Sequence, residues 1–188
     1  MDGDGSALEV TPLSGPLGAA IGGVDLSRPL AAGTLEAIRA TLVDAGVVVI
    51  RGQSLTREAQ LDFARRLGTP DRHPIANAME GHPEIIRVES PKGEGAFFGT
   101  SWHTDNSFFE KPSAITVLYA EIVPPARGDT LFASMELAWQ RLSEPIRRLL
   151  EPLAAVHSAA RAYDPRTTGT AKYEGKPAIS YTMSERVY

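Results

Sequence analysis

The chain has 188 residues, a formal net charge of −4 and no cysteine. Its length, with 43% hydrophobic and 22% charged residues, predicts one soluble globular domain with a real core. No Lys/Arg cluster or long apolar run is present, which argues against nucleic acid or a membrane as a partner. The lack of cysteine excludes disulfides, thiolate ligands and a cysteine nucleophile, and it fits a cytoplasmic location.

The first third of the chain predicts two helices around a short strand. One helix is expected from Thr34, as its cap, to Gly46, where it stops. A second is expected between the cap Thr56 and the stop signal Gly68. Between them, Val47–Ile50 is a β-branched run typical of a strand that is buried on both faces.

Short β-favouring segments separated by proline and glycine predict a mostly-β body. Strands are expected at residues 8–12, 85–88, 114–123, 130–133, 153–159 and 179–183. Residues 1–7 are expected to be disordered, the glycine-rich stretch 15–23 to form turns, and residues 135–150 to be helical with Ser134 and Ser143 as caps. This order favours a double-stranded β-helix (jelly roll) with flanking helices.

A histidine and an aspartate stand two residues apart in "GTSWHTDNSFF", residues 99–109. On an extended segment both side chains project to one face, so His103 and Asp105 could reach one cation while Thr104 points away. One imidazole and one carboxylate, joined by a second histidine, form the facial triad of non-haem Fe(II) oxygenases. The spacing is weak evidence, since it recurs at His82 and Glu84.

Two plainer interpretations of the pair stay open on spacing alone. His103 could be a core histidine and Asp105 a turn residue. A zinc hydrolase could use the same pair, although the sequence offers no third ligand or general base for it.

Ordered motifs resemble the taurine dioxygenase-like (TauD/TfdA) family of Fe(II)- and 2-oxoglutarate-dependent dioxygenases. The resemblance runs from about Leu8 to His157. Its motifs are "LEVTPLSGPLGAAIGGVDLSRPL", "VVVIRGQSLTREAQLDFARRLG", the pair His73-Pro74, "WHTDNSFFEKP" and "PPARGDTLFASMELAWQRLSEPIRRLL". The resemblance implies that residues 1–188 are the N-terminal two thirds of one such jelly-roll domain.

The resemblance also implies a role for five residues. His103 and Asp105 correspond to iron ligands, and Thr130 to the hydroxyl that contacts 2-oxoglutarate. His73 and Phe108 correspond to substrate-contacting positions. The plainer alternatives are that Thr130 is an ordinary β-favouring threonine, His73 a histidine in a turn and Phe108 a core aromatic.

Four further residues are assigned no role in the site. Trp102 is expected to pack in the core, and His82 and Glu84 to be surface residues. His157 is not expected to be the distal ligand.

The activity that the resemblance implies is hydroxylation of a small organic substrate with O₂ and 2-oxoglutarate, which releases succinate and CO₂. The family's second histidine ligand and its 2-oxoglutarate arginines have no counterpart here, so a truncated dioxygenase is expected. The alternatives are a catalytically incomplete fragment and a non-enzymatic module that binds a small acid or a partner chain. A jelly roll without its last strands would expose sheet edges, which would favour homo-oligomers.

The substrate stays open. Taurine is not favoured, because residues 75–77 and 99–101 lack the tyrosine and amide that taurine dioxygenase uses at the matching positions. A different small organic acid, a sulfonate, a sulfate ester and an aromatic ether stay open as substrates.

Overall fold

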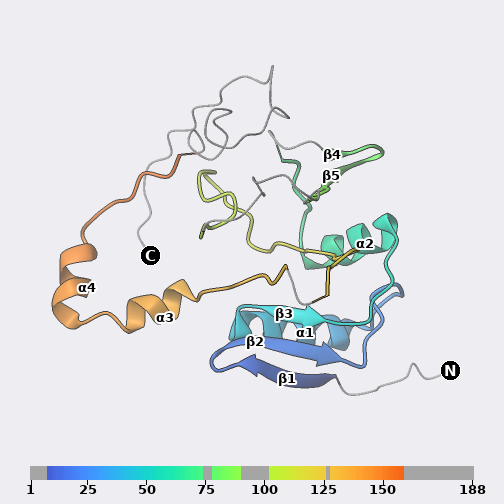
Figure 1. Ribbon diagram of the computed structural model, residues 1–188, viewed down its shortest axis with the longest axis horizontal. Helices are drawn as coiled ribbons and strands as arrows, with labels where there is room; N and C mark the ends of the chain where they lie inside the picture. Colours follow the sequence, from blue (N-terminus) through green and yellow to red (C-terminus); the bar gives the residue numbers. More distant parts are fainter. Residues whose placement is uncertain (1–7, 74–77, 90–101, 126–127, 159–188) are drawn as a thin grey trace. The chain divides into compact units, whose positions relative to one another are not determined.

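The computed structural model describes residues 8–73, 78–89, 102–125 and 128–158 (Figure 1). The chain divides into two compact units, each formed by two stretches of sequence. Unit 1 comprises Met1–Pro70 and Val117–Ser143, and unit 2 comprises Asp71–Thr116 and Glu144–Tyr188. The expected disorder of residues 1–7 and the expected strand at 179–183 lie outside the described residues.

Unit 1 is built on a three-stranded sheet with the order β1-β2-β3 (Figure 1). Strand β1 (Glu9–Ser14) runs antiparallel to β2 (Leu17–Gly22), and β2 runs parallel to β3 (Val48–Ile50). The tight β1–β2 turn uses Gly15 with a φ of 52°. The expected turn region 15–23 is confirmed at residues 15–16 but was wrong for residues 17–22, because β2 pairs on both sides and buries Ala19 and Ile21 despite its glycines.

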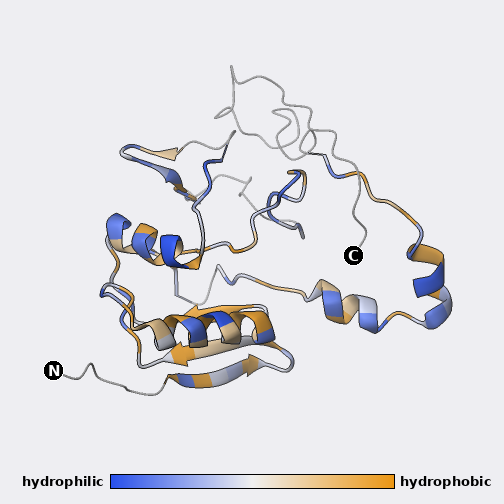
Figure 2. Ribbon diagram, turned by 180° about the vertical axis from the view of Figure 1, so that it is seen from behind, coloured by the Kyte–Doolittle hydropathy of each residue, from blue (hydrophilic) through white to orange (hydrophobic). Residues whose placement is uncertain are grey.

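Helix α1 (Ala32–Ala45) provides the crossover that the parallel β2 and β3 require. Figure 2 shows α1 in front of the sheet, with the hydrophobic strands β2 and β3 behind it. The helix ends as predicted at Gly46, whose φ is 70° and whose N–H donates to Leu42 O at 2.8 Å. The predicted cap was wrong: Thr34 lies inside the helix, and Ala31 occupies the N-cap without a side-chain hydrogen bond.

Helix α2 (Arg57–Leu67) confirms both of its predicted boundaries. The hydroxyl of Thr56 accepts a hydrogen bond from Ala59 N at 3.2 Å, which satisfies one of the free donors of the first turn. At the other end, Gly68 N donates to Ala64 O at 3.0 Å. These signals are local in sequence, which is why they could be recognised without a structure.

The core of unit 1 lies between the sheet and the helices. Ile21, Leu26, Ile38 and Phe63 are buried together. Partly buried residues pack around them: Leu8, Val24, Leu30, Leu35, Val48, Ile50, Leu55, Leu67 and Val117. The expected strand Val47–Ile50 is confirmed as β3, but its residues are half-buried rather than enclosed on both faces.

The segment after Val117 contacts the N-terminal part of unit 1 through alternate residues. Tyr119 accepts a hydrogen bond from Leu55 N at 3.2 Å, and Glu121 forms an ion pair with Arg57. The residues on either side of this pair face solvent, with Leu118 71% and Ile122 89% exposed. The period-two pattern is therefore present, but the strand expected at 114–123 was wrong because these residues join no described sheet.

The expected helical region 135–150 is two helices. In unit 1, α3 (Met135–Gln140) begins as predicted at Ser134, whose hydroxyl accepts from Leu137 N at 3.1 Å. In unit 2, α4 covers Glu144–Leu150. The expected strands at 130–133 and 153–159 were wrong over the described residues, where only a single bridge at His157 is found.

Unit 2 contains a small hairpin of β4 (Ala78–Met79) and β5 (His82–Ile86). The strand expected at 85–88 is thus confirmed in part, displaced toward the N-terminus. His82 and Glu84 were expected at the surface but are half-buried on β5, and Glu84 contacts Arg72 at 3.4 Å. Within the described ranges, no helix is long and apolar enough to cross a membrane.

Candidate metal centre

His103 and Asp105 lie side by side in unit 2. Nε2 of His103 is 3.2 Å from Oδ1 of Asp105, and the two side chains are 49% and 50% exposed. The local backbone differs from the expected strand: residues 102–104 have no regular structure, and a turn begins at Asp105. The two donor atoms nevertheless lie within 3.2 Å of each other.

The second oxygen of the Asp105 carboxylate has its own partner. The hydroxyl of Thr116 donates to Oδ2 at 2.9 Å. Thr116 lies eleven positions further along the chain, so this contact depends on how the intervening loop folds. The carboxylate is thereby held at both oxygens, with Oδ1 beside His103.

The turn after Asp105 depends on Asn106, which has a φ of 52°. Asparagine is one of the few residues that adopt this left-handed conformation readily. Its side-chain Nδ2 donates to Ser113 Oγ at 3.0 Å, and its carbonyl accepts from Phe109 N at 2.9 Å. The turn and residues 113–116 are therefore joined by two side-chain hydrogen bonds, Asn106–Ser113 and Thr116–Asp105.

An aromatic cluster follows directly from this turn. Phe108 is 7% exposed and packs edge-on against Phe109, with ring centroids 4.5 Å apart. The ring of Phe109 is 6.3 Å from that of His73, at a tilt of 50°. Two predicted substrate-contacting residues, His73 and Phe108, thus share the neighbour Phe109. Trp102 was expected in the core, but it is 70% exposed.

The donor set of the pair fits a divalent transition metal. An imidazole nitrogen and a carboxylate oxygen are the ligands that iron, zinc and manganese accept. Two such atoms, each about 2.1 Å from one ion at right angles to each other, lie about 3 Å apart. The observed 3.2 Å between Nε2 and Oδ1 satisfies this requirement. In the described part of the chain, no group of three or more metal-binding side chains occurs.

Thr130 belongs to unit 1, where it is exposed and has no regular secondary structure. Its contact with 2-oxoglutarate stays a prediction, as do the ligand roles of His103 and Asp105. His157 is exposed.

The sequence reasoning did not single out Thr116 and Asn106. Asn106 carried a usable signal, since asparagine after a short polar stretch favours a left-handed turn. Thr116 carried none, because a threonine in a β-favouring segment is ordinary.

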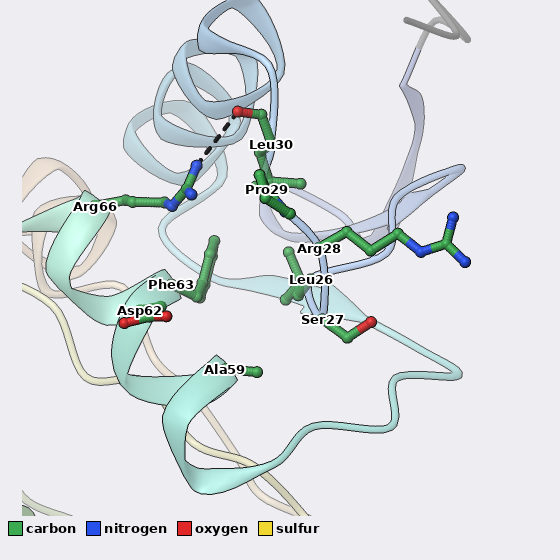
Figure 3. A pocket seen from close by; sticks show the side chains of 9 residues that line it. All are labelled: Leu26, Ser27, Arg28, Pro29, Leu30, Ala59, Asp62, Phe63 and Arg66. Carbon is green, nitrogen blue, oxygen red and sulfur yellow. Dashed lines mark hydrogen bonds between the residues drawn. The ribbon is translucent and has the colours of Figure 1, made fainter.

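A small pocket of about 80 Å³ lies in unit 1, away from every predicted site residue of that unit (Figure 3). It lies between the loop that follows β2 and helix α2, and Arg66 donates to Leu30 O at 3.3 Å across its rim. At the start of that loop, hydrogen bonds from the Ser27 hydroxyl and backbone N–H, together with Arg28, lower the pKa of Asp25. These contacts stabilise the loop.

Sequence comparison identifies the family to which the chain belongs. Residues 9–187 match the model of "Taurine catabolism dioxygenase TauD, TfdA family". The chain therefore belongs to the TauD/TfdA family.

Similar proteins carry dioxygenase and sulfatase names. The chain is 40% identical to an alpha-ketoglutarate-dependent sulfate ester dioxygenase from Pseudomonas putida, over 80% of this chain and 50% of the relative. It is 37% identical to an alkylsulfatase from Acinetobacter baylyi, over 80% of this chain and 47% of the relative. Among solved structures, a taurine dioxygenase from Burkholderia xenovorans is 34% identical with a TM-score of 0.65, over 80% and 53% of the two chains. The chain thus spans about half the length of these relatives.

Proposed function

We propose that this chain supplies two metal ligands, His103 and Asp105, to an Fe(II)- and 2-oxoglutarate-dependent dioxygenase that hydroxylates a small organic substrate. The observation that carries the proposal is the 3.2 Å approach of His103 Nε2 to Asp105 Oδ1, in a chain of the TauD/TfdA family. Bound Fe(II) and 2-oxoglutarate would supply an O₂-dependent oxidation that inserts one oxygen into a substrate C–H bond and releases succinate and CO₂.

The chain's own residues would bind and orient the reactants. The neutral imidazole of His103 and the charged carboxylate of Asp105 would hold the cation. The hydroxyl of Thr130 would donate to a carboxylate of 2-oxoglutarate. His73 and Phe108 would form part of an apolar surface beside the substrate, joined through Phe109.

Sulfate esters are the substrate class that we favour. The supporting observation is the similarity to the sulfate ester dioxygenase and to the alkylsulfatase, at 40% and 37% identity. An alkyl sulfate combines an apolar chain, which suits the aromatic cluster of Phe108 and Phe109, with an anionic head. We further infer that the whole protein folds as a single jelly-roll domain, as the TM-score of 0.65 to a taurine dioxygenase supports. Iron as the native metal, a cytoplasmic location and homo-oligomers stay predictions.

An anaerobic titration tests this proposal. The 188-residue chain, shown to be folded by circular dichroism, is mixed with Fe(II) and 2-oxoglutarate and followed in the visible range. We expect a metal-to-ligand charge-transfer band that Asp105→Asn abolishes. The matched control Asp62→Asn, which changes an exposed carboxylate on α2, should retain it. A medium-chain alkyl sulfate should shift the band, and taurine should not.

No band from the folded chain would contradict the proposal for this chain and would favour a catalytically incomplete fragment or the non-enzymatic binding module. A band that taurine shifts and the alkyl sulfate does not would contradict the substrate class alone.

A further inference from the structure

The two oxygens of Asp105 contact different partners. Oδ1 lies 3.2 Å from His103 Nε2, and Oδ2 accepts the Thr116 hydroxyl at 2.9 Å. Rotation of a carboxylate about its last side-chain bond has no sharp preferred angle, so an unrestrained aspartate samples a broad range of orientations. A hydrogen bond to one oxygen removes that freedom and fixes where the other oxygen points.

We propose that Thr116 is a positioning residue that holds Oδ2 of Asp105 so that Oδ1 stays beside His103 as a metal ligand. The inference rests on the proposed function, because it assigns Thr116 a role toward the metal that the pair would bind. Hydrogen-bond partners of ligating carboxylates are worth about 10- to 100-fold in metal affinity in other proteins.

The position of Thr116 is set by a second contact. Asn106 Nδ2 donates to Ser113 Oγ at 3.0 Å, which ties the residue after Asp105 to the stretch that ends in Thr116. The left-handed Asn106 closes the turn, and Phe109 N donates to its carbonyl at 2.9 Å. The hydroxyl therefore reaches Asp105 from a loop that has its own support.

The hydrogen bond between Thr116 and Asp105 is exposed, so its effect on side-chain position can be measured apart from its effect on stability. Asp105 and Thr116 are both exposed, and a hydrogen bond that competes with water contributes little to the free energy of unfolding. Loss of the hydroxyl should therefore leave the chain folded. Its consequence should appear in the geometry of the carboxylate, and so in metal affinity.

Co(II) binding to the 188-residue chain tests the proposal. Co(II) binds nitrogen and oxygen sites more tightly than Fe(II) does, and its visible absorption reports ligand geometry. Calorimetry and absorption are compared for the unchanged chain, Thr116→Val and Thr116→Ser. The valine variant keeps the shape without the hydroxyl, and the serine variant keeps the hydroxyl. Thr41→Val is the matched control, because Thr41 also donates its hydroxyl, to Ala37 O at 2.8 Å on α1.

We expect Thr116→Val to weaken Co(II) affinity about 10-fold or more and to alter the visible spectrum. Thr116→Ser should restore both, and Thr41→Val should change neither. Unchanged affinity in Thr116→Val, or equal loss in the serine and valine variants, would overturn the positioning role while the metal site stands. If His103→Ala binds Co(II) as well as the unchanged chain, the metal site itself is wrong and both proposals fall.

Discussion

The two units of the chain differ in what holds them together. Unit 1 is organised around buried apolar side chains, with Ile38 2% and Ile21 3% exposed. The part of unit 2 around the candidate ligands His103 and Asp105 is instead organised by hydrogen bonds among exposed or half-buried polar side chains, beside the buried Phe108. Burial provides most of a domain's stability, whereas exposed polar contacts contribute mainly to geometry. Mutations in unit 1 should therefore mainly change the free energy of unfolding. Mutations around His103 and Asp105 in unit 2 should mainly change metal affinity.

The largest effect on stability should come from the centre of unit 1. Ile38→Ala removes a side chain that is 2% exposed and should lower the free energy of unfolding by about 2–5 kcal/mol. Val43→Ala, on the same helix, changes a residue that is 86% exposed and should stay within about 0.5 kcal/mol. Urea denaturation followed by circular dichroism measures both. Similar losses in the two variants would mean that α1 is not packed as described.

A smaller effect should distinguish Thr56, the confirmed cap of α2, from Thr34, which lies inside α1. Thr56→Ala removes the acceptor of Ala59 N and should cost about 1 kcal/mol. Thr34→Ala places a better helix former inside α1 and should be neutral or stabilising by up to about 0.7 kcal/mol. Urea denaturation followed by circular dichroism measures the free energy of unfolding of both variants. If Thr34→Ala proved the more costly change, the start of α1 would be misplaced.

The same contrast explains what the sequence could predict. Helix ends at Gly46, Thr56, Gly68 and Ser134 were predictable because each signal lies within a few residues of the bond it makes. Strands were harder. Residues 117–122 show the expected alternation, but a strand needs a neighbouring strand, and alternate residues here contact the N-terminal part of unit 1 through side chains instead.

In the candidate site, too, some residues could be predicted from the sequence and others could not. His103 and Asp105 were found because they stand two residues apart within a family motif. Thr116 was not found, because its hydrogen bond to Asp105 depends on the turn at Asn106, and spacing alone gives no indication of it. Sequence reasoning therefore located the candidate ligand pair but not the residue that we propose orients it.

The central claim is that His103 and Asp105 bind one metal ion together, and Co(II) affinity measured by calorimetry tests it most directly. The account predicts that His103→Ala loses at least about 10-fold in affinity while urea denaturation of the chain stays unchanged. His157→Ala, which removes an exposed histidine in unit 2, should bind like the unchanged chain. Equal affinity in all three proteins, or a loss only in His157→Ala, would contradict the claim.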